Sequence, residues 1–245
     1  MNQNLAIAVH LHSLTRPNSL AVASEGRELS YKQLANGAAA IAARISQSPA
    51  WVRKNGRPPR VGILASRSAD ACLAVLGASW AGATYVPIGT KLPEERLLTI
   101  LSLCNLSALV ADAEGAKLLT KAVLASCPPL LILPGAAQHQ AIGDSGIEFH
   151  DIDALPESDG SEPARMEASD PAYIIFTSGT TGVPKGSLSR PVQSGTTSRR
   201  HPRYWVCGPA TGPLRPWNSP LMCHFTTCSP LGRLALHSMC YRRAA

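Results

Sequence analysis

A short stretch near residue 180 combines hydroxyl, glycine and lysine residues directly after an apolar run, YIIFTSGTTGVPKGS, residues 173–187. Glycines let the backbone approach an anion closely, and backbone amides together with hydroxyls can then surround it. Lysine adds a point charge that suits phosphate oxygens. The pattern therefore predicts a polyphosphate site. Its residues are Thr177, Ser178, Gly179, Thr180, Thr181, Gly182 and Lys185.

Two common phosphate loops do not fit this stretch. The nucleoside-triphosphatase loop needs glycine immediately before the lysine, whereas Pro184 precedes Lys185 here. The dinucleotide loop needs G-x-G-x-x-G, and Gly179 and Gly182 have a different spacing. Short clusters of Ser, Thr and Gly also occur in exposed turns, which is the alternative for a shorter match.

The elements that must position this loop alternate along residues 5–176. Short β-rich runs alternate with stretches of helical period, which predicts an α/β fold with a layered, largely parallel sheet and flanking helices. Ser30 and Gln33 have the spacing of a capping box. The expected helices cover residues 5–14, 30–45, a segment that contains Ala71, Val75, Leu76 and Ser79, residues 93–104 and a segment ending near 125; the expected strands cover 19–24, 28–30, 60–66, 84–88, 107–112, 129–134, 147–152 and 172–177.

Some local features also lead to expectations. Pro87 has no N–H to donate, so the strand at 84–88 is expected at a sheet edge or the proline at a strand end. The acidic stretch 157–170 is expected to be a solvated loop. His10 and His12 are expected to be solvated. The scattered cysteines Cys72, Cys104 and Cys127 are expected to be buried thiols in a reducing compartment.

The longer string YIIFTSGTTGVPKG resembles the signature phosphate loop of the adenylate-forming (AMP-dependent synthetase/ligase) superfamily. LSYKQLA (29–35) and VLGASWAGATYVPIGTKLPEERLLTIL (75–101) resemble earlier segments of that superfamily, in the same order. The second segment is most similar to the amino-acid adenylation domains of nonribosomal peptide synthetases and to D-alanine–carrier protein ligases. Gly89 stands where that branch usually carries Asp. The chain thus resembles the N-terminal part of such an enzyme.

The resemblance implies that the seven loop residues hold the β- and γ-phosphates of ATP with Mg²⁺ as cofactors. A carboxylic acid, and for this branch an amino acid, would attack the α-phosphorus to give an acyl-adenylate and pyrophosphate. A thiol of a carrier protein or of CoA would then accept the acyl group. Lys185 would bind phosphate rather than act as a base, and the sequence identifies no catalytic residue.

Residues 187–245 differ in composition from the rest of the chain. Residues 1–186 carry 15 Lys+Arg against 16 Asp+Glu, whereas 187–245 contain eight Arg, no Lys and no acid. The family's later binding segments are not found there. We therefore expect a partial adenylation domain at 5–186 and an irregular, unstructured tail rich in Arg, Pro, Ser and Cys at 187–245. The chain is expected to be truncated and inactive, and a frameshift would explain the tail; reading the gene in its other two frames tests this.

Two other functions stay open from the sequence: a non-catalytic ATP- or pyrophosphate-binding fragment, and a basic interaction protein that acts through the tail. The tail lacks the motifs of specific nucleic-acid binding. Cys223, Cys228, His237 and Cys240 lack the paired spacing of a zinc site, so no metal site is expected. A secretory signal and a long apolar span are both missing, which predicts a cytoplasmic chain without a membrane partner.

Overall fold

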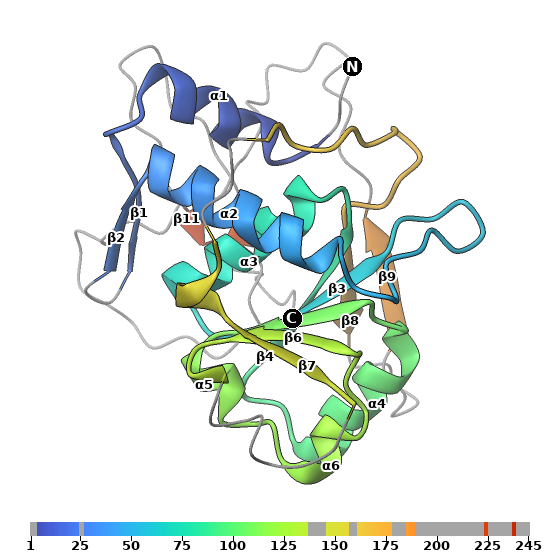
Figure 1. The fold of residues 1–245 in the computed structure, drawn as a ribbon. Coiled ribbons are helices and arrows are strands. Elements are labelled where there is room, and N and C mark those ends of the chain that lie inside the picture. Colours follow the sequence, from blue (N-terminus) through green and yellow to red (C-terminus); the bar gives the residue numbers. More distant parts are fainter. Residues whose placement is uncertain are drawn as a thin grey trace, which may run out of the picture.

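The computed structural model describes residues 4–24, 27–136, 146–156, 161–177 and 185–189, and two short strands beyond them. Within these residues a central sheet is covered by helices on both faces (Figure 1). The helices are α1 (Ile7–Thr15), α2 (Tyr31–Ile45), α3 (Ala69–Trp80), α4 (Glu94–Cys104), α5 (Ala113–Ala116) and α6 (Lys121–Leu124), with a 3-10 turn η1 (Ile152–Ala154). The strands are β1 (Leu20–Ser24), β2 (Arg27–Ser30), β3 (Arg60–Ala65), β4 (Thr84–Gly89), β5 (Ala108–Ala111), β6 (Leu130–Leu133), β7 (Glu148–Asp151), β8 (Tyr173–Thr177), β9 (Lys185–Ser189), β10 (Cys223–His224) and β11 (His237–Ser238).

The large sheet has the strand order β7-β6-β5-β3-β4-β8-β9. Its first six strands run parallel, and only β9 runs antiparallel, beside β8. The first strand of this sheet in the sequence, β3, lies in its middle. The next strand, β4, lies on one side of β3, and β5 lies on the opposite side of β3. The order of strands reverses between β3 and β5, which is the topological switch point of a doubly wound sheet.

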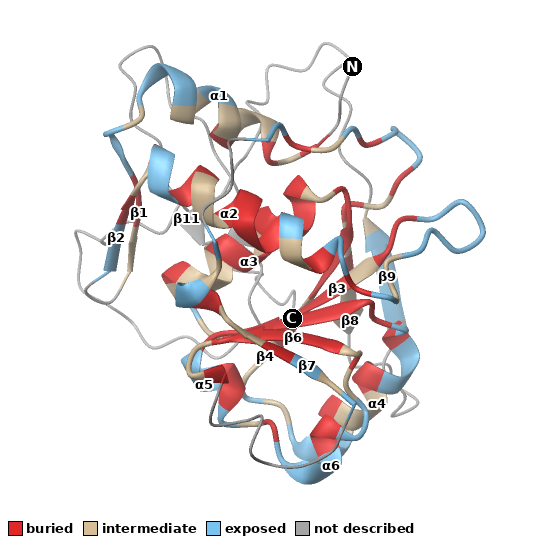
Figure 2. Ribbon diagram, viewed as in Figure 1, coloured by how far each residue is buried: buried red, intermediate tan, exposed pale blue. Residues whose placement is uncertain are grey.

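Each face of the sheet buries its own core (Figure 2). On one face, α1, α2 and α3 pack on Val61, Ile63, Ala108, Val110 and other side chains that alternate along the strands. On the other face, α4, α5 and α6 pack on the intervening side chains, such as Leu64, Leu109 and Leu131. Because both faces are covered, the central strands are apolar throughout rather than alternating. The expected layered α/β fold is confirmed.

The capping box expected at Ser30 is present. The Ser30 hydroxyl accepts a hydrogen bond from Gln33 N (3.3 Å), and the Gln33 side chain accepts one from Ser30 N (2.9 Å). The helix then runs for 15 residues and buries a face that includes Leu34, Ile41 and Ile45. The strands expected at 19–24 and 28–30 are also present, as β1 and β2, and they pair antiparallel as a hairpin.

The expectation of an edge position for the strand at 84–88 is wrong. β4 lies inside the sheet, between β3 and β8. β3 pairs with β4 along its whole length, but the register of β4 with β8 contains only Tyr85 and Tyr173. Pro87 therefore falls beyond this pair, where the missing N–H interrupts no ladder to β8. The proline thus stands in an interior strand, at a position that is paired with Ile63 of β3 and lies outside the recorded register with β8.

Other local expectations also need correction. The stretch 161–170 is not simply solvated, because Met166 is 3% exposed and Asp170 is 4% exposed. Trp80 Nε1 donates to the carbonyl of Ser161 (2.9 Å), so this stretch packs along α3 without regular structure. The helix expected to end near residue 125 is two short helices, α5 and α6. Residues 157–160 lie outside the described residues.

The expected environments of histidine and cysteine are met only in part. His10 and His12 are half-buried, and their rings contact those of Trp80 and Tyr31 at centroid distances of 5.5 and 5.0 Å. They are therefore not simply solvated. Cys104 is 1% exposed, as expected of a buried thiol, whereas Cys72 and Cys127 are half-buried.

Candidate functional site

The chemistry-bearing loop is held between two adjacent strands. β8 and β9 pair antiparallel with Thr177 opposite Lys185, so the first and last predicted phosphate ligands leave the sheet side by side. The structure describes the backbone of these two residues. The other predicted ligands, Ser178, Gly179, Thr180, Thr181 and Gly182, lie outside the described residues. The strand pair thus brings the two ends of the loop together.

The start of β8 is fastened from both sides. Tyr85 N donates to the carbonyl of Ala172 (3.1 Å), and Ala172 N donates to the carbonyl of Ser189 (2.9 Å). Pro171 precedes Ala172, and its carbonyl accepts a hydrogen bond from the Thr84 hydroxyl (2.7 Å). The chain entering β8 is therefore anchored to both neighbouring strands five to six residues before Thr177.

Gly186, directly after the lysine, is also placed for a physical reason. It stands opposite Phe176 in the register. A Cβ at this position would lie 3.2 Å from both Ile174 Cγ2 and the Phe176 ring, tighter than most Cβ contacts in proteins. A glycine lets the strand that carries Lys185 lie against the aromatic ring. The strand continues to Ser189, three residues beyond the expected domain boundary at 186.

The loop emerges at the edge of the sheet where ligands bind in doubly wound folds. Because β8 is parallel to β4 and β3, Thr177 lies at the same carboxyl edge as the end of β3. Neighbouring strands are about 4.8 Å apart, so the loop starts roughly 10 Å from β3 and its switch point with β5.

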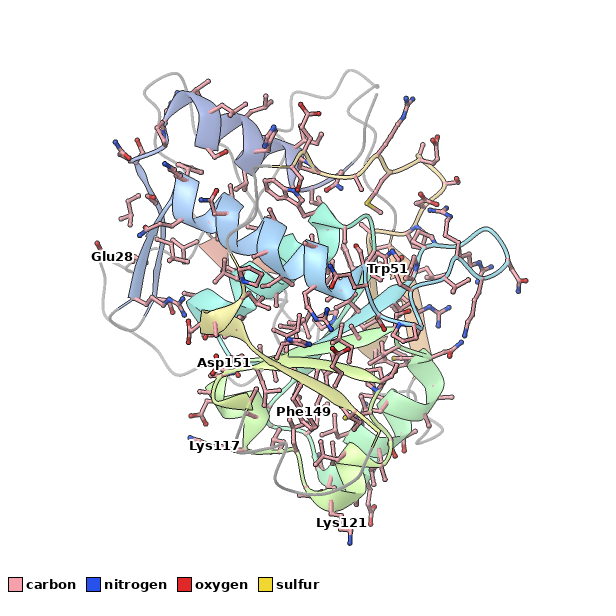
Figure 3. All side chains as sticks on the ribbon, viewed as in Figure 1. Glu28, Trp51, Lys117, Lys121, Phe149 and Asp151 are labelled. Atoms are coloured by element: carbon pink, nitrogen blue, oxygen red, sulfur yellow. The ribbon has the colours of Figure 1, made fainter. Side chains whose placement is uncertain are left out.

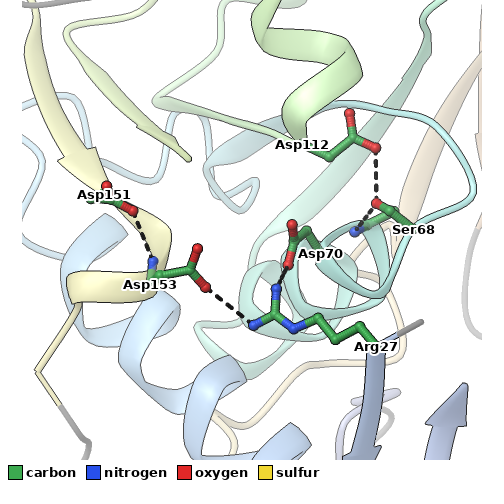
Figure 4. Close-up of polar contacts among 7 residues, drawn as sticks. Arg27, Ser68, Asp70, Asp112, Asp151 and Asp153 are labelled. Atoms are coloured by element: carbon green, nitrogen blue, oxygen red, sulfur yellow. Dashed lines mark hydrogen bonds and ion pairs between the residues drawn. The ribbon is translucent and has the colours of Figure 1, made fainter. Parts of the chain in front are cut away.

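The switch point itself is filled by a buried carboxylate (Figure 4). Asp112, which follows β5, is 2% exposed. Its Oδ2 accepts bonds from Ser66 N (2.7 Å), the Ser66 hydroxyl (2.6 Å) and the Ser68 hydroxyl (2.8 Å), while Oδ1 accepts one from Gly115 N (2.8 Å). Desolvation raises the pKa of Asp112, but these hydrogen bonds outweigh it and the pKa is lowered. The carboxylate therefore organises the protein's own turns.

A second polar group lies beside it. Arg27 of β2 pairs with Asp70 in the first turn of α3 and, at 3.2 Å, with Asp153 of η1 (Figure 4). Desolvation raises the pKa of Asp70, against the opposing effect of Arg27. One arginine thus ties the hairpin β1–β2 to two elements at the carboxyl edge of the sheet.

Sequence reasoning missed both groups. Ser66 and Ser68 lie 46 and 44 positions before Asp112, and the sheet topology brings them to its carboxylate. A usable signal existed, because Ser68 and Asp112 each follow an apolar strand and precede a helix, where Ser and Asp are preferred caps.

The described part of the chain offers no separate cation site. It contains no group of three or more His, Cys, Asp or Glu side chains that could hold a metal ion. Magnesium is commonly bound through substrate phosphates, waters and one or two carboxylates.

Family comparison agrees with the fold and the loop. Residues 11–189, more than half of the chain, match the family described as AMP-binding enzyme. The chain belongs to this family and represents the N-terminal part of the adenylate-forming fold.

Curated relatives belong to much longer proteins. Tyrocidine synthase 3 of Brevibacillus parabrevis is 34% identical over 174 residues, which are 70% of this chain and 2% of the relative. Surfactin synthase subunit 3 of Bacillus subtilis is 33% identical over 71% of this chain and 12% of the relative. Novobiocin biosynthesis protein H of Streptomyces niveus is 33% identical over 70% of this chain and 26% of the relative. The chain thus spans about a quarter or less of these relatives.

Solved structures share the fold. IdnL7 is 29% identical with a TM-score of 0.56, over 76% of this chain and 34% of that one. The anthranilate CoA ligase AuaEII in complex with anthranoyl-AMP has a TM-score of 0.60 at 23% identity, over 78% and 34% of the two chains. The AMPPNP-bound form of the nonribosomal peptide synthetase FmoA3 has a TM-score of 0.58 at 21% identity, over 78% and 17%. Among the described residues, no helix is long and apolar enough to cross a membrane.

Proposed function

We propose that this chain carries the phosphate-binding part of an enzyme that activates an amino acid as its acyl-adenylate. One observation carries the proposal: Thr177 and Lys185 face each other across β8 and β9 at the carboxyl edge of the sheet. The loop between them has the hydroxyls, glycines and lysine suited to a polyphosphate. In this proposal the seven predicted residues hold the β- and γ-phosphates of ATP, accompanied by Mg²⁺.

The chemistry follows from holding those phosphates. An oxygen of the substrate carboxylate bonds to the α-phosphorus, the bond from that phosphorus to the β-phosphate oxygen breaks, and pyrophosphate leaves. Charge neutralisation by Lys185 and the loop amides favours the developing negative charge on the leaving group. The sulfur of a carrier-protein or CoA thiol then bonds to the acyl carbon, the bond from that carbon to the phosphate oxygen breaks, and AMP leaves together with the thiol proton. The synthetase relatives support an amino acid as substrate and a carrier protein as partner.

Residues 187–245 contain no Asp or Glu, so they supply no carboxylate for the ribose hydroxyls or for a metal ion. We therefore expect this chain alone to bind ATP without amino-acid-dependent turnover. Binding without turnover is also the behaviour of the alternative, a non-catalytic nucleotide-binding fragment. Pyrophosphate release that depends on an added amino acid would instead indicate a complete enzyme.

The test is thermal unfolding of the full chain with and without Mg-ATP. The wild type should be stabilised, because a ligand that binds only the folded state raises the unfolding temperature. The Lys185→Ala variant should bind ATP roughly tenfold or more weakly, as for loss of one charged hydrogen bond. Lys32→Ala is the control, since Lys32 is exposed on α2. An equal ATP shift in wild type and Lys185→Ala would refute the assignment.

A different result would favour the tail as the functional segment. Retention on DNA that weakens with salt and disappears when residues 190–245 are deleted would indicate a basic interaction protein. The same chain would then show no stabilisation by Mg-ATP.

A further inference from the structure

A cavity opens at the edge of the sheet opposite the phosphate loop. It has a volume of about 360 Å³ and lies between the loop that precedes β3 and the segment that joins α4 to β5. β3 begins at Arg60 and β5 at Ala108, so the cavity faces the amino ends of these strands. The loop that forms its outer wall projects from the side of the molecule next to β3 (Figure 1). Its lining residues are Val52, Lys54, Asn55, Arg57, Pro58, Pro59, Arg60, Asn105 and Ser107.

A tight turn places two of the cations side by side. Lys54 and Arg57 form an antiparallel bridge, and Arg57 N donates to the carbonyl of Lys54 (3.0 Å). Between them Asn55 and Gly56 both have positive φ, 52° and 73°, which a two-residue hairpin turn of this kind requires. Like charges directly opposite each other on a strand pair are destabilising. The hairpin therefore holds two positive charges together at a cost.

The other walls of the cavity fix this hairpin in position. Lys54 Nζ donates to Asn105 Oδ1 (3.3 Å), at the C-cap of α4. Arg60 Nη1 donates to the carbonyl of Cys104 (2.8 Å), and Ser107 N donates to the carbonyl of Arg60 (2.8 Å). At the base of the loop, Trp51 packs against the core (Figure 3). The cations therefore stand on a wall that is anchored to the sheet.

None of the lining residues neutralises the two cations of the hairpin. The lining contains three cationic side chains and no carboxylate. The acid that contacts this hairpin, Asp170, is already paired with Arg53 (2.8 Å), which also donates to the carbonyl of Gly56 (2.7 Å). Within the described part of the chain, the Arg57 guanidinium forms no ion pair, and Lys54 contacts an amide rather than an acid. A bound anion would supply the missing charge.

The size and charge of the cavity indicate which kind of anion it would bind. Its volume is in the range of small-molecule sites. One phosphate group carries about two negative charges on oxygens that match both an arginine fork and a lysine ammonium, whereas a single carboxylate carries one. We propose that this cavity is a second anion site, which binds a small phosphate-bearing molecule through Lys54 and Arg57, independently of the loop at 177–185.

Inorganic pyrophosphate is the probe, and calorimetric titration of the full chain is the measurement. The titration is done in a Lys185→Ala background, so that binding at the phosphate loop is weakened and the cavity is seen separately. Saturable binding should remain in that background. Adding Lys54→Gln and Arg57→Gln together should weaken it roughly a hundredfold, because each of the two lost charged hydrogen bonds costs about tenfold. Arg57→Lys keeps the positive charge but lacks the paired N–H donors of the guanidinium, so this variant should bind pyrophosphate with intermediate affinity.

Lys32→Gln with Lys121→Gln is the matched control, because it removes the same charge from exposed sites on α2 and α6 that do not line the cavity. This control should bind pyrophosphate like the Lys185→Ala background. Circular dichroism melting confirms that all variants are folded. Three results would each overturn the second site. The first is equal weakening of pyrophosphate binding in the Lys32→Gln/Lys121→Gln control. The others are unchanged binding in the Lys54→Gln/Arg57→Gln variant and no saturable binding in the Lys185→Ala background.

Discussion

The carboxylate of Asp112 accepts a hydrogen bond of 2.8 Å from the hydroxyl of Ser68, so the residue that follows β5 holds the residue that caps α3. The same carboxylate also caps α5 through Gly115 N. One buried side chain therefore organises both helix starts next to the switch point of the sheet.

Asp112→Asn should destabilise the fold strongly. The amide replaces one acceptor oxygen with a donor, which leaves half-buried N–H and O–H groups of Ser66 and Ser68 without that acceptor. We expect the free energy of unfolding to fall by about 3 kcal/mol, measured by urea denaturation. Asp153→Asn is the control: that carboxylate is 61% exposed and pairs with Arg27 at 3.2 Å, so it should cost less than about 1 kcal/mol. Equal losses for the two variants would contradict this role of Asp112.

Asp112 and Asp70 should affect acid stability in opposite directions. The pKa of Asp112 is lowered in the fold, so its contribution is complete above the unfolded pKa and is lost as the pH falls through the folded pKa. The pKa of Asp70 is raised, so stability falls as the pH rises from its unfolded pKa through its folded pKa. Denaturation at about pH 7 and about pH 3 should show that Asp112→Asn costs more at neutral pH and Asp70→Asn costs less there. The same pH trend in both variants would count against these shifts.

Gly115 should tolerate no side chain. A Cβ at this position would lie 1.8 Å from the carbonyl oxygen of Leu64, because α5 rests directly on the backbone of β3. Gly115→Ala must displace α5 and with it the bond to Asp112, so a loss of about 3 kcal/mol is expected in thermal unfolding. Gly89→Ala is the matched control, since a Cβ there meets nothing within 4 Å. Equal melting temperatures for the two variants would contradict this close packing.

Local signals in the sequence were sufficient for most of the fold. Apolar runs such as Leu130–Leu133 lie inside the sheet, and the Ser30–Gln33 spacing marks the start of α2. These features depend on neighbouring residues, so the chain order reveals them. The strand β9 was not predicted: it runs over Lys185–Ser189, across the change of composition at residue 187.

Features that depend on distant contacts were not predicted. Pro87 lies inside the sheet, at a position that pairs with Ile63 of β3 and not within the register of β4 with β8. The Asp112 group and the cavity beside Lys54 both join segments that are more than 40 residues apart in the chain. Such sites require the strand order, which the sequence pattern alone left undetermined. Five of the seven predicted phosphate ligands lie outside the described residues, so their roles stay predictions.

Ser30→Ala tests a feature that the sequence did predict. Removing the hydroxyl leaves Gln33 N without its capping acceptor, and the usual cost of such a loss is about 1 kcal/mol. Chemical denaturation at neutral pH measures it. Ser102→Ala removes an exposed hydroxyl that bonds only to the carbonyl of Thr99, within α4, and should change stability by less than about 0.5 kcal/mol. A Ser30 variant as stable as the Ser102 variant would argue against the cap.

Cys104 should be almost inert in the folded chain. Burial raises the pKa of its thiol to about 12, although Arg60 acts in the opposite direction. The thiolate is the reactive form, so at about pH 8 alkylation by iodoacetamide should be roughly a thousandfold slower than in the unfolded chain. Burial also raises the pKa of Cys127 to about 12, but its side chain is only half-buried.

Comparing the alkylation rates of Cys104 and Cys127 distinguishes the effect of thiol ionisation from the effect of reagent access. Because their pKa values are alike, a difference in their rates must come from how easily the reagent reaches each sulfur. Cys104, at 1% exposed, should therefore be the slower one. Mass spectrometry of the two peptides after a short pulse gives both rates, and the same pulse in denaturant should label both equally. Faster labelling of Cys104 than of Cys127 in the folded chain would mean that the face between α4 and the sheet opens more readily than its packing indicates.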